Sequence, residues 1–299
     1  MPGFEYSLRT HCVCGSILSE FMPTIRRDVE WGEVKFIQCK RCRSWCQSPQ
    51  ITPASISDWY DSDEYRGGAN VSGSAYVDYL KDESCRLREG HKRYQRDLVN
   101  YLPEKNAKVL EVGCATGSLL AAIREYGHDV TGIDISPRFA KEAKELYDLD
   151  VQVGDMASAD FPQQHFDMII LLGTVSNLQD IPTTLIRIRK MLKIGGALIF
   201  NFPDANSLTA RLYGERYWMF APSVGTFMTT DCCKKLLSTA GFDEINIKID
   251  YQMPSFSKVL NHSKLSQLIP VSKIFSHRFN SFPFLLPIPG VKLARARIT

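Results

Sequence analysis

The stretch "VLEVGCATGSLLAAI", from Val109 to Ile123, decides the fold class. Its apolar start predicts a strand, its glycine-broken middle predicts a turn, and its apolar end predicts a helix. In the turn, Gly113 permits a tight bend, Ala115 lets the backbone approach a ligand, and Gly117 allows close packing where the helix begins. This order of elements indicates a ligand-binding unit of strand, turn and helix.

Residues 106 to 251 continue the alternation. Short apolar stretches such as "DVTGIDI" and "FDMIILL" alternate with helix-like ones such as "PRFAKEAKELYD". Pro137 and Pro182 stand near expected helix starts. This spacing predicts an α/β fold, a parallel sheet covered by helices. The stretch "GVKLARARI" near the end is expected to add a last edge strand.

Composition divides the chain of 299 residues into four segments. Residues 1–50 hold five of the nine cysteines, 51–105 read as a helical linker or lid, 106–251 as the core, and 252–299 as a basic C-terminal insertion. No signal peptide opens the chain and no apolar run reaches the roughly 18 residues of a membrane-spanning helix. A cytoplasmic protein with reduced thiols is therefore expected.

Positive charge is concentrated at the C-terminal end. The net charge is +3, but residues 252–299 hold seven Lys or Arg and no Asp or Glu, which leaves −4 for residues 1–251. This segment is also rich in phenylalanine, and it suits an anionic substrate or a peripheral contact with a membrane surface. The alternative is a solvated insertion whose aromatic rings pack on the core.

Three carboxylates indicate the ligand of the turn. Asp134 ends the second strand, 21 residues beyond Gly113, where it can accept both hydroxyl protons of a ribose. Asp155 follows the third strand and can reach an adenine edge. Glu111 would repel a pyrophosphate but attract an ammonium group. A cationic ligand with adenine, ribose and amino-acid parts is S-adenosylmethionine.

At these residues the chain resembles the class I S-adenosylmethionine-dependent methyltransferases. The resemblance covers about residues 106 to 251, through "VLEVGCATG", "VTGIDIS", "GDMASADFP", "FDMIILLGTVSNLQD" and "RKMLKIGGALIFNFPD". It implies a Rossmann-like, doubly wound, mostly parallel sheet of seven strands. A Rossmann-like domain for another ligand is the alternative, because nicotinamide and flavin folds use the same turn. The implied cofactor-binding residues are Tyr76, Glu111, Gly113, Cys114, Ala115, Gly117, Asp134, Ile135, Asp155, Met156 and Leu172.

A closer resemblance, to a narrower bacterial group, extends to the N-terminus. The stretches "DWYDSDEYRGG", "SAYVDYL" and "PDANSLTARLYGERYW" look like proteins that join a small zinc-binding module to a methyltransferase of sugar or secondary-metabolite pathways. By this analogy Tyr76 lies over the methionine end of the cofactor. The alternative is that Tyr76 is a packing residue of the N-terminal helix.

Four of the five cysteines of residues 1–50 form two pairs, and Cys46 is left over. Two cysteine knuckles that close a short loop suit a tetrahedral, structural Zn²⁺ site in a zinc-ribbon-like module. The second pair has the usual spacing, but the first pair is separated by one residue, so a histidine can replace one thiol. Unmetallated buried thiols are the alternative. The expected ligands are Cys12, Cys14, Cys39 and Cys42, with His11 as the substitute for Cys12.

The base that a hydroxyl or carbon acceptor needs is missing from its expected place. In the related proteins a histidine often follows the tryptophan of the stretch that reads "YWMFAPSVGTFMTT" here, which contains none. In "SNLQD", Asn177 likewise stands where many relatives carry histidine. Either the acceptor needs no strong base, or another residue serves. The candidates for that role are Tyr76, Tyr79, His91 and Tyr217.

The resemblance implies methylation of a small-molecule acceptor, at an oxygen or carbon of a nucleotide- or lipid-linked sugar or of a secondary metabolite. RNA methylation with the zinc module as a grip is an alternative, but the net negative charge of residues 1–251 speaks against nucleic acid. A non-catalytic cofactor-binding protein is another, suggested by the missing histidine.

Overall fold

The computed structural model describes residues 4–19, 21–29, 32–66, 70–71, 74–75, 83–217, 219–221, 223–252 and 286–298. A seven-stranded sheet forms its centre, in the order β10-β9-β8-β11-β12-β15-β14. The first five strands of that order are mutually parallel, while β15 pairs antiparallel with both β12 and β14. The strands are β8 Lys108–Val112, β9 Asp129–Asp134, β10 Val151–Val153, β11 Phe166–Leu171, β12 Leu192–Pro203, β14 Asn246–Gln252 and β15 Leu286–Arg297.

Helices cover both faces of this sheet, which confirms the expected Rossmann-like, doubly wound fold. Val109, Met168 and Ile170 pack with η1, the extension of α3, and with α4 on one face. Their neighbours along the strands, such as Leu110 and Ile169, pack with α6 and α8 on the other. Strands buried on both faces explain why the sequence shows continuous apolar stretches. The helices are α3 Glu83–Arg93 with its extensions η1 Tyr94–Leu98 and η2 Val99–Tyr101, α4 Ser118–Glu125, α5 Pro137–Tyr147, η3 Val175–Asn177, α6 Ile181–Met191, α7 Leu208–Tyr213, η4 Gly214–Arg216 and α8 Thr230–Thr239.

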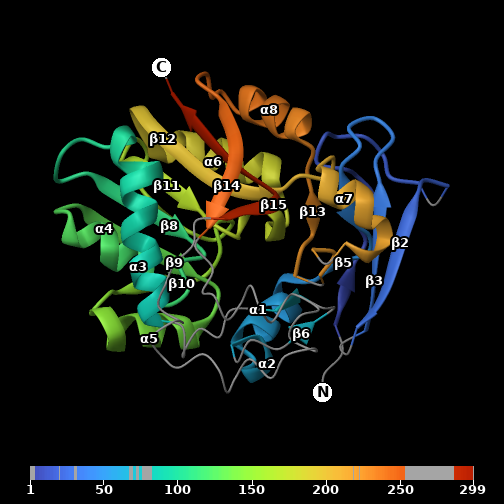
Figure 1. The fold of residues 1–299 in the computed structure, drawn as a ribbon, viewed down its shortest axis with the longest axis horizontal. Helices are drawn as coiled ribbons and strands as arrows, with labels where there is room; N and C mark the ends of the chain where they lie inside the picture. Colours follow the sequence, from blue (N-terminus) through green and yellow to red (C-terminus); the bar gives the residue numbers. More distant parts are fainter. Residues whose placement is uncertain are drawn as a thin grey trace.

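The expectation that the last strand lies at an edge is wrong. β15 lies between β12 and β14, and β14 is the edge strand (Figure 1). Val291, Leu293, Ala294 and Ala296 of β15 are all buried, so residues of both alternating faces are covered. A strand that is apolar on both faces gains more from an interior position than from an edge.

The cysteine-rich segment forms a second, smaller sheet beside α7 (Figure 1). Its strands lie in the order β13-β4-β3-β2, and β13 comes from the core sequence. Residues 226–227 therefore complete a sheet that residues 24–47 begin. The remaining N-terminal elements are short, and the full set is β1 Tyr6–Ser7, β2 Thr24–Val29, β3 Gly32–Gln38, β4 Trp45–Gln47, β5 Gln50–Ile51, β6 Asn70–Val71, β7 Ser74–Ala75, β13 Thr226–Phe227, α1 Pro53–Asp61 and α2 Asp63–Arg66.

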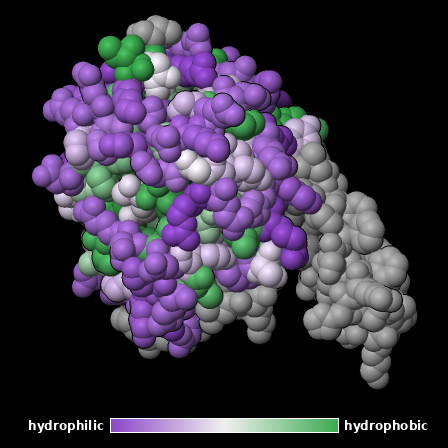
Figure 2. Space-filling model, turned by 90° about the vertical axis from the view of Figure 1, so that its left-hand side faces the viewer, coloured by the Kyte–Doolittle hydropathy of each residue, from purple (hydrophilic) through white to green (hydrophobic). Residues whose placement is uncertain are grey.

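The outer surface over α3, α4 and α5 is mostly hydrophilic, with hydrophobic side chains in small separate spots (Figure 2). None of the helices in the described ranges has the length and apolar character needed to cross a bilayer. Most of the basic C-terminal segment, residues 253–285, lies outside the described residues, so its expected contact with a membrane or an anionic substrate stays a prediction.

Candidate functional site

The loop between β8 and α4 has an unusual backbone. Gly113 (φ +73°), Ala115 (φ +48°) and Gly117 (φ +77°) all adopt left-handed conformations. A Cβ atom on Gly113 would lie 2.3 Å from Oγ1 of Thr174, so no larger residue fits there. Ala115 occupies a conformation that costs a non-glycine residue about 1 kcal/mol or more. The backbone therefore requires glycine at positions 113 and 117, whereas Ala115 is held in this conformation at a cost.

Asp134 holds this loop against the end of β9. Its carboxylate accepts hydrogen bonds from the backbone N–H of Ala115 (2.8 Å) and of Ser136 (3.0 Å). Burial raises the pKa of Asp134, although these hydrogen bonds counteract the rise. The structure thus brings the loop and the expected ribose-binding carboxylate together at the carboxyl ends of neighbouring parallel strands.

Glu111 is a buried acid at the start of the same loop. Its side chain is 5% exposed, and one carboxylate oxygen has no hydrogen-bond partner among the described residues. Burial raises its pKa to about 8; Arg86 opposes the rise and Asp134 adds to it. An acid held in this state gains free energy when a cation is brought to it, because the cation compensates the cost of the buried charge. The residues of the loop therefore fit a ligand with an ammonium group.

The other expected cofactor residues surround this loop in different roles. Cys114 is buried against β9, where its Sγ would lie 2.8 Å from a Cβ on Gly132. Asp155 uses one carboxylate oxygen to accept from the N–H groups of Ala157 and Ser158, so it caps its own turn. Ile135 and Leu172 are half-buried and directly follow β9 and β11. Met156 is a buried core residue that directly follows Asp155.

The candidates for the base lie in unfavourable places or outside the described residues. Tyr76 and Tyr79 belong to the residues that the structure does not describe. His91 lies 3.5 Å from the carboxylate of Glu125, at the end of α4 that is opposite the loop. Tyr217 is fully buried, and burial raises its pKa to about 12, so it is a hydroxyl that gives up its proton reluctantly.

Helix α1 supplies a polar pair that the sequence did not single out. The amide of Asn177 donates to the hydroxyl of Tyr60 at 2.6 Å and to the carbonyl of Gly173 at 3.2 Å. Ser57 of the same helix donates to the carbonyl of Ile135. Helix α1 therefore spans the carboxyl ends of β9 and β11. The signal in the sequence was Asn177 in the place of a histidine, but its partner Tyr60 is far away along the chain.

Helix α3 also reaches the loop, through residues that the sequence did not single out. Thr116 donates to the carboxylate of Glu83 at 3.0 Å, and Arg86 donates to Thr116 at 2.9 Å. The hydroxyl of Tyr147 donates to Glu83 at 2.6 Å. The helix that contains the basic stretch "CRLREGHKR" therefore contacts the ligand loop and also faces the outer surface.

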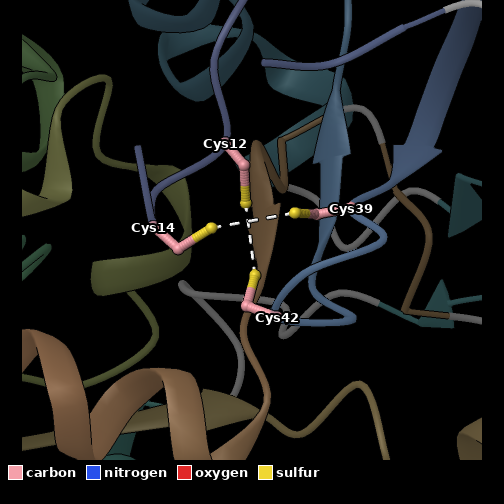
Figure 3. Close-up of side chains that lie close together, drawn as sticks. All are labelled: Cys12, Cys14, Cys39 and Cys42. Carbon is pink, nitrogen blue, oxygen red and sulfur yellow. Dashed lines mark hydrogen bonds between the residues drawn. The ribbon is translucent and has the colours of Figure 1, made fainter. Parts of the chain in front are cut away.

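The four expected metal ligands converge on one point (Figure 3). The Sγ atoms of Cys12, Cys14, Cys39 and Cys42 all lie within 4.8 Å of one another. The Sγ–Sγ distance is 3.4 Å between Cys12 and Cys42 and 3.7 Å between Cys14 and Cys39. Four thiolates around a tetrahedral Zn²⁺ lie about 3.8 Å apart, because each Zn–S bond is about 2.3 Å long. The four thiols therefore fit a zinc ion.

Two neighbouring groups stand outside this set of four. His11 is exposed, and its Nδ1 bonds to the hydroxyl of Thr10 at 2.8 Å. The cluster found among the described residues contains Cys12 and not His11. Cys46 is fully buried and lies 3.6 Å from Cys12, so it packs against the cluster.

The sequence of the chain is similar to those of known methyltransferases. A profile of the family described as "Methyltransferase domain" matches residues 86–246. The ubiquinone biosynthesis O-methyltransferase of Cereibacter sphaeroides is 27% identical over an alignment of 207 residues, and the match covers 65% of this chain and 81% of that protein. The protein of the same name from Roseobacter denitrificans is 24% identical, over 68% of this chain and 88% of its own length.

Solved structures share the fold at low identity. Magnesium protoporphyrin IX methyltransferase from Synechocystis, solved with bound SAH, superposes with a TM-score of 0.52 at 17% identity, and covers 83% of this chain and 100% of that chain. An S-adenosylmethionine-dependent methyltransferase from Thermotoga maritima has a TM-score of 0.51 at 19% identity, and covers 74% of this chain and 97% of that chain.

The family match spans more than half of the chain and includes the left-handed loop, Asp134 and the carboxyl ends of the central strands. The cysteine cluster lies before the matched residues, so the family match does not test the narrower resemblance to zinc-containing proteins. The chain belongs to the methyltransferase-domain family and is a class I S-adenosylmethionine-dependent methyltransferase.

Proposed function

We propose that the protein transfers the methyl group of S-adenosylmethionine to an oxygen atom of a small-molecule acceptor. The observation that carries the proposal is the buried, unpartnered oxygen of Glu111 beside the left-handed loop. The choice of oxygen is supported by the two relatives reported above, which are both named O-methyltransferases. When bound, the cofactor supplies a methyl group on a positively charged sulfur.

Four residues near the loop have proposed roles that fit their surroundings. Glu111 holds the ammonium group, and Asp134 accepts the ribose hydroxyls while it keeps Ala115 in place. Arg86, whose charge acts on Glu111, is suited to the carboxylate of the methionine part. The turn that Asp155 caps presents its backbone to the adenine edge. Together these groups orient the ligand and exclude water, which is most of what methyl transfer requires.

Tyr60 is the proposed proton acceptor in place of the missing histidine. Its hydroxyl lies at the carboxyl end of β11, where Asn177 donates to it. A donated hydrogen bond stabilises the negative charge that a tyrosine acquires when it loses its proton. After the phenol has released its own proton to solvent, the Tyr60 oxyanion can remove the proton of an acceptor hydroxyl as the oxygen of that hydroxyl takes the methyl group.

The acceptor itself is proposed from the resemblance rather than from the fold. The expected classes are nucleotide- or lipid-linked sugars and secondary metabolites. The relatives named for ubiquinone biosynthesis do not favour one of these classes over the others.

We also propose a structural Zn²⁺ at Cys12, Cys14, Cys39 and Cys42, because the four sulfur atoms have the spacing of a tetrahedral site. Metal analysis of the purified protein tests this: one zinc per chain is expected, and none after Cys39→Ser.

Isothermal titration with S-adenosylmethionine tests the cofactor site. Asp134→Ala is expected to weaken binding by about 1.5–3 kcal/mol, the range for hydrogen bonds that involve a charged group. Asp129→Ala is the matched control, because Asp129 is the exposed first residue of the same strand. Equal affinity of the Asp134 variant and the wild type would contradict the ribose assignment. Transfer of a labelled methyl group to a pool of small-molecule acceptors then tests the reaction.

A further inference from the structure

A cavity of about 560 Å³ lies at the far edge of the large sheet, between β14, β15 and the extensions η1 and η2 of α3. Its volume is within the range of roughly 300–1,000 Å³ that is typical of small-molecule sites. Charged side chains make up much of its described lining. Four of them are cations and two are acids, namely Arg96, Lys248, Arg295 and Arg297 against Asp97 and Glu244. The lining therefore carries an excess of two positive charges.

The two acids do not cancel this excess. One carboxylate oxygen of Asp97 accepts from Arg295 at 2.5 Å. The other accepts from Arg93 at 3.2 Å and from Arg96 at 2.6 Å, so Asp97 already serves three cations. Glu244 is exposed, and solvent screens its charge. Positive charge is therefore left over for a ligand.

Two guanidinium groups of β15 also have donors to spare. Arg295 is 9% exposed and Arg297 is half-buried. The Nε atom of each is buried and has no hydrogen-bond partner among the described residues. A buried donor without an acceptor is costly, and such a group in a folded protein calls for an explanation. An anion bound in the cavity would supply the acceptors that these two side chains lack.

Lys248 and Tyr101 complete the cationic wall. Lys248 is exposed and forms no ion pair with another described residue, so its ammonium group is free to turn to a ligand. Arg297 is held in place, because its guanidinium carbon lies 4.7 Å from the centre of the Tyr101 ring and it donates to the carbonyl of Asn100 at 3.2 Å. A guanidinium that is already ordered loses less conformational freedom when it binds an anion.

The cavity is separate from the site that is proposed for the cofactor. Four strand spacings of about 4.8 Å, or roughly 19 Å, separate β14 from β8. Arg297 pairs with Ala197, whereas the carboxyl end of β12 is at Pro203. No residue of the loop between β8 and α4 belongs to the described lining.

We propose that this cavity binds a small soluble molecule through a phosphate or diphosphate group, at a site apart from the methyl-transfer centre. Guanidinium groups match phosphate oxygens with paired, charge-assisted hydrogen bonds. The proposal also gives an anionic partner to Arg295 and Arg297, two of the seven basic residues of the C-terminal segment 252–299.

Isothermal titration of the full chain with inorganic pyrophosphate, at constant ionic strength, tests the proposal. Lys248→Glu reverses a charge in the cavity wall and is expected to weaken binding by about tenfold or more. Arg297→Gln removes one guanidinium and is expected to weaken binding by about fivefold or more. Lys235→Glu, at an exposed position of α8, is the matched control. It changes the net charge as Lys248→Glu does, lies outside the lining, and is expected to bind as the wild type does.

Three results would overturn the proposal: no binding of pyrophosphate to the wild type, equal binding to Lys248→Glu, or an equal loss in Lys235→Glu, which would reveal general charge attraction only. If Lys248→Glu does not fold, Lys248→Gln decides the matter, with an expected loss of about threefold or more. Titration with S-adenosylmethionine keeps the two proposals apart. Lys248→Glu should bind the cofactor as the wild type does, and a wild type that fails to bind the cofactor would defeat the proposed function alone.

Discussion

At the scale of single residues, Glu111 couples cofactor binding to protons. Burial raises its pKa from an ordinary 4.5 to about 8, so about 0.9 of the side chains are protonated at pH 7. An ammonium group brought to the carboxylate favours its charged form, so binding should release close to one proton at pH 7. Titration in two buffers of different ionisation enthalpy measures this release. Glu111→Gln should abolish it, and an undiminished release in that variant would assign the proton elsewhere.

The same shift makes the stability of the free protein depend on pH. Because the folded pKa lies above the unfolded one, the folded state binds more protons between about pH 4.5 and 8, and stability falls as pH rises through that window. Glu111→Gln removes this contribution. Its advantage over the wild type in denaturant melts should therefore grow from pH 5 to pH 8. A constant difference would show that Glu111 titrates normally.

Tyr60 is the residue on which the proposed base depends. Tyr60→Phe keeps the ring and removes the hydroxyl that Asn177 contacts. We expect turnover with a hydroxyl acceptor to fall by about 10²–10⁴, the usual contribution of a general base. Affinity for the cofactor should change little, because Tyr60 has no proposed contact with it. Turnover within threefold of the wild type would show that the acceptor loses its proton without this hydroxyl.

At the scale of elements, a buried ionic network fastens α3 to the far edge of the sheet. Arg93 donates to Asp250 at 2.6 Å and to Asp97 at 3.2 Å, and the side chains are 5% exposed or less. Burial lowers the pKa of Arg93, but the two carboxylates outweigh this and raise it. Asn201 links Asp250 to the backbone N–H of Gly173, in the loop after β11. The network therefore joins α3, β14 and the ligand-binding edge.

Removal of the central cation should be costly. Arg93→Met leaves the fully buried carboxylate of Asp250 without its cation, whereas Asp97 keeps Arg96 and Arg295. We expect the substitution to lower the free energy of unfolding by about 3–5 kcal/mol. Arg88→Met, at an exposed position of the same helix, should stay within about 0.5 kcal/mol of the wild type. Chemical denaturation of both variants measures the difference. Similar stabilities would mean that the network is dispensable for α3.

Elements were predictable from the sequence where one local signal fixed them. The glycine-rich turn, the prolines at helix starts and the continuous apolar strands each follow from short stretches of sequence. The place of β15 was not, because apolar residues on both faces show that a strand is covered but do not show which two strands it pairs with. Tyr60 was missed for the same reason: it acts with Asn177, 117 positions away in sequence.

At the scale of the whole molecule, the cysteine-rich segment is joined to the core by more than its chain connection. The backbone N–H of Gln47 donates to the carbonyl of Gly225, and the N–H of Thr229 donates to the hydroxyl of Ser44. The hydroxyl of Thr229 donates to the carbonyl of Cys42, one of the four clustered cysteines. The segment from 225 to 229 also begins α8, because Thr229 is its N-cap. Order in the cluster should thus be transmitted to β13 and to the start of α8.

Removal of the proposed zinc is therefore expected to loosen both partners of this contact while the large sheet stays folded. A four-ligand zinc site contributes folding free energy directly, and a short segment with few core residues has little else to replace it. Hydrogen exchange measures the effect: in Cys39→Ser, the amides of Gln47 and Thr229 should exchange at least tenfold faster than in the wild type. Amides of β8 and β11 serve as the internal control and should stay protected, because their strands lie at the centre of the large sheet. Unchanged protection at Gln47 and Thr229 would show that the contact with the core, and not the metal, holds the small sheet in place.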